Sequence, residues 1–310
     1  MTRSPTRAEE TALTAFDTGL AIALALIGSV GNAYAVVLQQ HAVDATVSAD
    51  AGDGSRTVSL RRMLTLVRTP RWVAGIGLVL VAAAFHIGAL ALAPITIIQP
   101  VGVLAVLFAI VFASRQRRSW PGGRVWLGAA LTVAGITGFV LVAAVQVTTS
   151  DEVPGRSALV AAGVLLVLSL GCACVGALGR SWAKCLGWAA ACSIVFGLAS
   201  ALMRSATLAI RAHTPWLSPT MVGLAIGLVL CYASGGWLAQ QAYASGPPEI
   251  VMSSLTVLDP LVAVCFGLAV LGEGSQITVL GGTGMTLAAL LAGAGVVVLA
   301  RHHPETTKAS

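Results

Sequence analysis

The sequence is poor in charge. Only 10% of its 310 residues are Asp, Glu, Lys or Arg, whereas 57% are hydrophobic. A water-soluble domain carries about 25% charged residues, so this shortage excludes a soluble domain of useful size. Because chains with many long apolar segments cross membranes as helices, the composition indicates an all-α polytopic membrane protein.

The sequence also lacks the motifs of common enzymes and metal sites. It has no HExxH motif, no GxSxG motif and no Asp-rich cluster such as enzymes acting on prenyl groups need. None of its six cysteines forms a CxxC pair, so we expect them to be small buried apolar side chains. We therefore expect no enzymatic activity and no cofactor, with a membrane-embedded enzyme or a non-transporting scaffold as alternatives.

Windows without charge predict the membrane spans, since a span needs about 20 apolar residues. Nine are predicted: 18–43, two within 72–114 that hinge at Pro94, then 125–150, 157–179, 185–210, 219–248, 250–272 and 274–300. This divides the chain into a tail (1–17), a first membrane repeat (18–150, with a basic loop at 44–71), a connector span (151–184), a second repeat (185–300) and a tail (301–310).

The net charge of +6 comes from basic residues that gather in loops. This pattern is typical of membrane topology and of contact with anionic lipid, and it predicts no nucleic-acid partner. With nine spans, one side receives Arg56, Arg61, Arg62, Arg68, Arg71, Arg115, Arg117, Arg118, Arg124, Arg180, Lys184, Arg301 and Lys308, and the other receives Arg3, Arg7, Arg156 and Arg211. We therefore expect a plasma-membrane protein with its N-terminus outside and its C-terminus in the cytoplasm.

The second part of the basic loop has helical periodicity. Leu60, Met63, Leu64 and Val67 recur at helical spacing within Ser59–Arg68. This pattern predicts a short basic amphipathic helix on the inner membrane surface. An ordinary solvated loop is the alternative.

The two halves of the chain resemble each other. Three pairs of segments match in the same order: Gly31–Val37 with Gly197–Met203, Ala89–Pro94 with Ala242–Pro247, and Gln99–Val106 with Asp259–Phe266. The pairing relates spans one to four to spans six to nine. Because this offset of five spans is odd, the halves are expected to cross the membrane in opposite senses. Inverted repeats are found in many secondary transporters, which bind substrate between the repeats.

Two segments resemble a known superfamily. The stretch Leu-Asp-Pro-Leu-Val-Ala-Val-Cys-Phe-Gly-Leu-Ala-Val-Leu-Gly-Glu at 258–273 resembles a span of EamA-type members of the drug/metabolite transporter (DMT) superfamily. The stretch 93–106, in which Pro94 and Pro100 are followed by Gly102, resembles the NIPA-like branch. The resemblance implies a transporter whose central cavity is lined by spans one, two, three, six, seven and eight. Its NIPA-like part implies nine spans and magnesium transport.

Asp259 is the leading candidate for a binding group. It lies in the middle of the eighth predicted span, where an ionisable side chain is costly and usually functional. Pro260 follows it, lacks an N–H and so frees a backbone carbonyl one turn earlier. A proton, a cation or a polar solute would suit both groups. The structural alternative is a kinked packing helix whose carboxyl group is bonded to a neighbouring span.

The other candidates are the few polar residues inside the predicted spans, each with a structural alternative. Asn32 and His86 would bind a substrate or take part in interhelical packing. Arg204 would line the cavity or reach the membrane surface. Glu249, at a helix start, would bind a ligand or interact favourably with the helix dipole. The remaining candidates are Gln99, which is the repeat mate of Asp259, and Gln240 with its neighbour Gln241.

These residues predict a secondary transporter that moves a small polar metabolite or cation by alternating access. The alternative is a NIPA-like magnesium carrier, whose metal ligands would be Asp259 and Glu249; without a divalent substrate no metal site is assigned. The expected partners are the solute or cation and membrane lipid. The Gly223–Gly227 GxxxG motif suits helix packing within the chain or a homodimer, which is left open.

Overall fold

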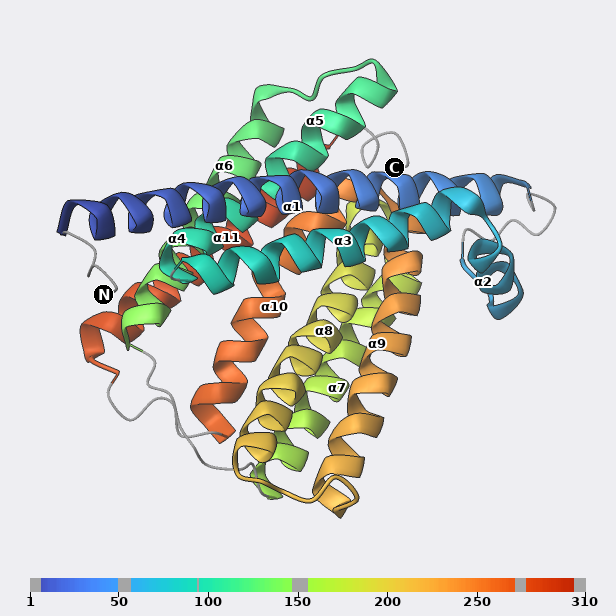
Figure 1. Ribbon diagram of the computed structural model, residues 1–310. Helices are drawn as coiled ribbons and strands as arrows, with labels where there is room; N and C mark the ends of the chain where they lie inside the picture. The colour runs from blue at the N-terminus through green and yellow to red at the C-terminus, as the bar shows by residue number, and fades with distance from the viewer. Residues whose placement is uncertain (1–6, 50–56, 94, 147–155, 271–276, 304–310) are drawn as a thin grey trace.

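The computed structural model describes residues 7–49, 57–93, 95–146, 156–270 and 277–303. Pro94, Glu273 and both chain ends (1–6 and 304–310) lie outside these residues. Within the described ranges the regular structure is entirely α-helical (Figure 1): α1 (Arg7–Ala49), α2 (Leu60–Val67), α3 (Pro70–Leu92), α4 (Ile95–Val103), α5 (Ala105–Arg117), α6 (Gly123–Gln146), α7 (Arg156–Leu178), α8 (Ser181–Arg211), α9 (Pro219–Ser245), α10 (Pro248–Val270) and α11 (Val279–His302).

Nine helical segments of the described chain are long and apolar enough to cross a membrane. They are α1, α3, α4 with α5, and α6 to α11. The predicted number of spans is confirmed, and the chain is an all-α multi-pass membrane protein. The short helix predicted in the basic loop is present as α2, so the alternative of an ordinary loop is wrong.

Helix ends follow from proline and from hydroxyl side chains. Ser218 accepts a hydrogen bond from the N–H of Met221 and so caps α9, whose first residue is Pro219. At the other end of α9, Gly246 precedes Pro247 and Pro248, and α10 begins at Pro248, where a missing N–H leaves no helical hydrogen bond unmade. This tight joint places Glu249 in the first turn of α10.

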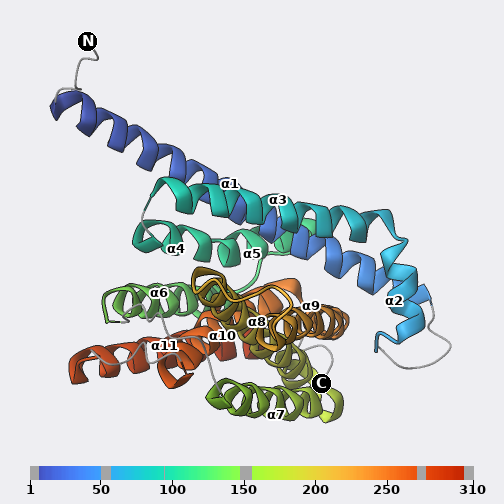
Figure 2. The ribbon, with the colours of Figure 1, turned by 60° about the horizontal axis from the view of Figure 1, so that its bottom comes forward.

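Pairs of long helices build the molecule. Figures 1 and 2 show α1 beside α3 and α6 beside α11, while α8 packs on α7, α9 and α10. Between α6 and α11 the backbones touch, since a Cβ atom on Gly135 would lie 2.4 Å from the nitrogen of Ala292. The peripheral helix α7 packs mainly on α8, and most of its surface is exposed, as expected for a lipid-facing span.

The cysteines only partly follow the expectation that they are buried. All six are free thiols; Cys185, Cys192 and Cys231 are buried, and Cys172 is half-buried. Cys174 on α7 and Cys265 on α10 are exposed, so the expectation is wrong for these two. A weakly polar thiol is tolerated at an exposed position within a membrane span.

The two ends of the bundle differ in packing. The largest buried apolar cluster includes Ala42 and Val43 late in α1, Cys185 early in α8, Ala242 late in α9 and Ile250 early in α10. These positions lie at the end of the bundle that carries most of the arginines. At the opposite end, Figure 1 shows the C-terminal ends of α3 and α8 diverging.

Candidate functional site

A cavity of about 540 Å³ lies between α1, α3, α4, α6, α8 and α10. Its lining therefore comes from both predicted repeats. Most of the lining is apolar, and its side chains with hydrogen-bonding groups are Ser29, Asn32, His86, Gln99, Ser200, Thr256 and Asp259. The cavity lies within the usual size range of small-molecule sites, which is about 300–1,000 Å³.

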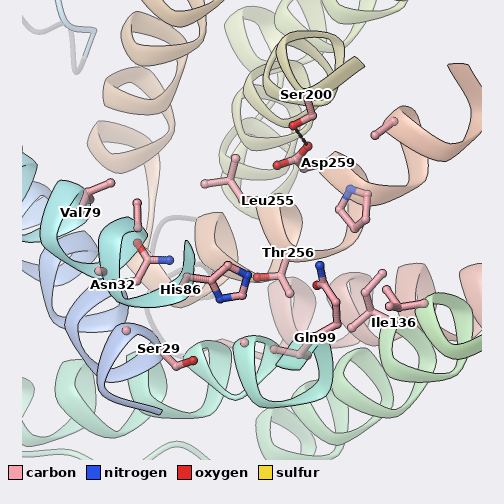
Figure 3. A pocket seen from close by; sticks show the side chains of 18 residues that line it. Ser29, Asn32, Val79, His86, Gln99, Ile136, Ser200, Leu255, Thr256 and Asp259 are labelled. Carbon is pink, nitrogen blue, oxygen red and sulfur yellow. Dashed lines mark hydrogen bonds between the residues drawn. The ribbon is translucent and has the colours of Figure 1, made fainter. Parts of the chain in front are cut away.

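The carboxyl group of Asp259 is held by α8. The Ser200 hydroxyl donates a hydrogen bond of 2.9 Å to Oδ1 of Asp259 (Figure 3). One turn before Ser200, Gly197 lets the two helices approach, since a Cβ atom there would lie 2.5 Å from the Cβ of Val262. This close approach brings the hydroxyl and the carboxylate together and leaves Asp259 half-buried at the cavity.

Prolines free backbone carbonyls beside Gln99 and Asp259, which the sequence predicts to be equivalent positions of the two halves. Pro260 has no N–H, so the carbonyl of Thr256 has no helical donor, and Thr256 lines the cavity. In α4, Pro100 frees the carbonyl of Thr96 in the same way. Shortly after it the helix is interrupted at Leu104, between α4 and α5. Each half thus combines a polar side chain with a freed backbone acceptor.

The remaining polar groups come from α1 and α3. The ring of His86 lies over Gly102, where an added Cβ would be 3.4 Å from its Cε1 atom. Oγ of Ser29 lies 2.8 Å from the carbonyl oxygen of Ala25 and 3.0 Å from that of Val101, which ties α1 to α4. Asn32 lies one turn after Ser29. Figure 3 shows Asn32, His86 and Gln99 around the same space as Thr256 and Asp259.

The cavity is therefore rich in hydrogen-bond acceptors. Asp259 is the single carboxylate among its described lining residues, and those residues include no lysine or arginine. Negative charge without a fixed positive partner attracts a cation or a proton. The amides, hydroxyl groups and imidazole add hydrogen bonds, and the apolar walls suit the hydrocarbon part of a small solute.

The structure thus brings together four of the predicted candidates: Asn32, His86, Gln99 and Asp259. Arg204 is half-buried in α8, one turn after Ser200, and is not among the residues lining this cavity. Gln240 also lies elsewhere, because its Oε1 accepts a hydrogen bond of 3.1 Å from Nε1 of Trp72.

Glu249 belongs to a separate charged cluster at the arginine-rich end. Its Oε1 accepts a hydrogen bond of 2.5 Å from Nη2 of Arg117 and lies 2.6 Å from Nε2 of His303. The side chain is fully buried, and its Oε2 has no hydrogen-bond partner in the described structure. Ten residues separate Glu249 from Asp259, or about 15 Å of helix. The two carboxylates therefore belong to different sites.

Sequence reasoning did not select Ser29, Ser200 or Thr256. A signal for Thr256 exists, because it precedes Asp259 by three residues just as Thr96 precedes Gln99 in the other half. Comparison of the chain with protein-family models, with curated proteins and with solved structures gives no match. The resemblance to drug/metabolite transporters therefore stays a prediction, and function has to be inferred from the cavity itself.

Proposed function

We propose that this protein is a secondary transporter that moves a small polar metabolite or cation by alternating access. The observation that carries the proposal is the cavity, which holds the carboxyl group of Asp259 in the middle of a membrane-spanning helix. An ionisable side chain at that depth is usually functional, and binding sites of secondary transporters lie near the midplane between two repeats. Asp259 binds the cation or the coupling proton in this proposal.

The packing of the two halves supports the proposed repeat. In the first half α1 packs on α3 and on α4 with α5; in the second, α8 packs on α9 and on α10. In both halves the fourth span, α6 or α11, contacts the third and also its own mate in the other half. We propose that the halves are related by rotation about an axis in the membrane plane, which would let each half take the conformation of the other.

In the proposed transport cycle, this structure is the state in which the arginine-rich end of the bundle is closed. Arg117 of the first half and Glu249 of the second are bonded there, and apolar side chains of both halves pack around them. The cavity residues Ala82 to His86 of α3 and Ser200 of α8 lie in the C-terminal halves of those helices, away from that end, and Val79 lies near the middle of α3. The cavity would therefore be reached from the side opposite the arginine-rich loops.

The lining favours a singly charged or polar solute over magnesium. Mg²⁺ prefers octahedral oxygen coordination and is usually held through carboxylates. Asp259 is the one carboxylate among the described lining residues, and Glu249 is engaged about 15 Å away along α10. A small amine or quaternary ammonium compound would match one carboxylate, several neutral acceptors and apolar walls.

Purified protein should be stabilised by such compounds. Ligand at 100 times its Kd raises the free energy of unfolding by about 2.7 kcal/mol. We expect a thermal-shift screen of small amines, quaternary ammonium compounds, neutral polar metabolites and Mg²⁺ to give the largest shifts for one class of organic cations. The same compounds should shift the Asp259→Asn protein little. A screen in which Mg²⁺ alone stabilises the wild type would favour the magnesium carrier instead.

We further propose that the protein lies in the plasma membrane with its N-terminus outside and its C-terminus in the cytoplasm. The support is the predominance of arginine and lysine in the loops of one side. A reporter active only in the cytoplasm should work when fused after Ser310, and one active only outside should work when fused at Thr2. Activity of the cytoplasmic reporter at Thr2 would contradict this topology.

A further inference from the structure

The short helix α2 presents an apolar stripe away from the protein. Leu60, Leu64 and Val67, spaced four and three residues apart, are 75%, 63% and 49% exposed. Arg61 on the same helix and Arg68, the residue that caps its C-terminal end, are also exposed. The opposite face packs inward through Leu66, which is fully buried. Leaving these three large apolar side chains of α2 in water costs free energy, because moving each one from water to an apolar environment is favourable.

Contacts on both sides of α2 fix it to α9. Before α2, the N–H of Val58 donates a hydrogen bond of 2.9 Å to Oε1 of Gln241, and Nε2 of Gln241 donates one of 2.8 Å to the Val58 carbonyl. Nε1 of Trp237 donates to the same carbonyl at 3.2 Å. After α2, Nε1 of Trp72 donates to Gln240. The exposed face is therefore held in a set orientation, which lowers the entropic cost of binding.

The position of α2 identifies what covers this face. Only Arg68 and Thr69 separate the end of α2 from Pro70, the first residue of the membrane-spanning helix α3. Figures 1 and 2 show α2 turning sharply away from the direction of α3. A helix that turns away at the start of a span lies at the level of the lipid headgroups, where an apolar stripe enters the acyl boundary.

Charge selects the kind of lipid. The exposed residues Arg61, Arg68 and Arg71 lie on or beside α2, and no Asp or Glu occurs between residues 57 and 72. We propose that the outer face of α2 is a binding surface for anionic phospholipids, with the stripe among the acyl chains and the arginines at the phosphates. Because it requires only that the chain lies in a membrane, this proposal stands even if the protein is not a transporter.

Titration with phosphatidylglycerol tests the proposal on the full chain. Purified protein in micelles that contain phosphatidylcholine is titrated with phosphatidylglycerol, and its melting temperature gives the apparent affinity. Each arginine near an anionic surface contributes about fivefold in affinity. The R61Q/R68Q/R71Q protein should therefore bind phosphatidylglycerol at least about tenfold more weakly than the wild type. The matched control R115Q/R118Q/R124Q removes three exposed arginines, one from the last turn of α5, one from the loop that follows and one from the first turn of α6. It should change this affinity much less.

Amide hydrogen exchange in nanodiscs locates the site. Residues 57–69 should exchange more slowly when the nanodisc contains phosphatidylglycerol, and the Leu60→Ser/Leu64→Ser protein should lose this protection. Equal weakening by the two arginine triples would show a general charge effect and overturn the assignment. The assignment is also overturned if protection at 57–69 is the same without phosphatidylglycerol. A change in the number of chains per nanodisc, with lipid affinity unchanged, would instead identify the face as a contact between copies.

Discussion

We expect the Asp259→Asn protein to fold and insert normally but to lose coupled transport of any solute that stabilises the wild type. Asparagine keeps the shape of the side chain and can still accept the hydrogen bond that Ser200 donates at 2.9 Å. It cannot carry negative charge or take up a proton. Because Asp259 is the one carboxylate among the described lining residues, no other acidic side chain of that lining would replace it.

Uptake into proteoliposomes, measured over a range of pH, tests this expectation. Asp17→Asn is the matched control, since it removes the same charge near the N-terminal end of α1, away from the cavity. Ser200→Ala should slow transport less than Asp259→Asn does. It leaves the carboxyl group in place and removes one hydrogen bond to it, which is worth about 1.5–3 kcal/mol when the group is charged. An Asp259→Asn protein with the wild-type rate and pH dependence would leave this carboxyl group as a packing residue.

The spans could be predicted from the sequence because the thickness of the bilayer sets the length of an apolar segment. Their ends could not. The first apolar window covers 18–43, whereas α1 runs from Arg7 to Ala49, because helical hydrogen bonds continue into polar residues that hydropathy does not count. The interruption at Leu104 was also missed, since it follows Pro100 by four residues within an uninterrupted apolar stretch.

The site was only partly predictable for a related reason. Polar residues are scarce in apolar spans, so Asn32, His86, Gln99 and Asp259 could be selected, and the structure places all four at one cavity. Composition does not reveal the rotation of a helix, which directs Gln240 toward Trp72 and away from the cavity. The partners of Glu249 could not be predicted from the sequence, because Arg117 and His303 come from the ends of helices that are distant along the chain.

The charged cluster around Glu249 carries the largest expected effect on stability. Its Oε1 is shared by Arg117 and His303, and the carboxyl group is fully buried. Breaking a buried ion pair costs about 3–5 kcal/mol, because one charge is left without its partner. We expect Glu249→Gln to lower the free energy of unfolding by about 3 kcal/mol, the lower end of that range, because 24% of the Arg117 side chain remains exposed.

A double-mutant cycle separates loss of the pair from loss of packing. Arg117→Leu and Glu249→Leu should each destabilise the protein, while the double variant should recover much of the loss, since apolar replacement of a buried pair is often neutral or stabilising. Stability is measured by thermal melting in one detergent. Strict additivity of the two single changes would show that the pair contributes nothing as a pair.

The same variants should open the arginine-rich end of the bundle, because Arg117 and Glu249 connect the first half of the chain to the second. Cys185 is a native reporter: its thiol is fully buried near Gly246, at the joint between α9 and α10. Glu249→Gln should raise the rate at which a water-soluble maleimide alkylates Cys185, as measured by mass spectrometry of the Cys185 peptide.

Cys192, also fully buried but two turns further along α8, should react no faster than in the wild type and serves as the internal control. Equal acceleration at both thiols would indicate general loosening of the fold, and an unchanged rate at Cys185 would show that the cluster stabilises this end without closing it.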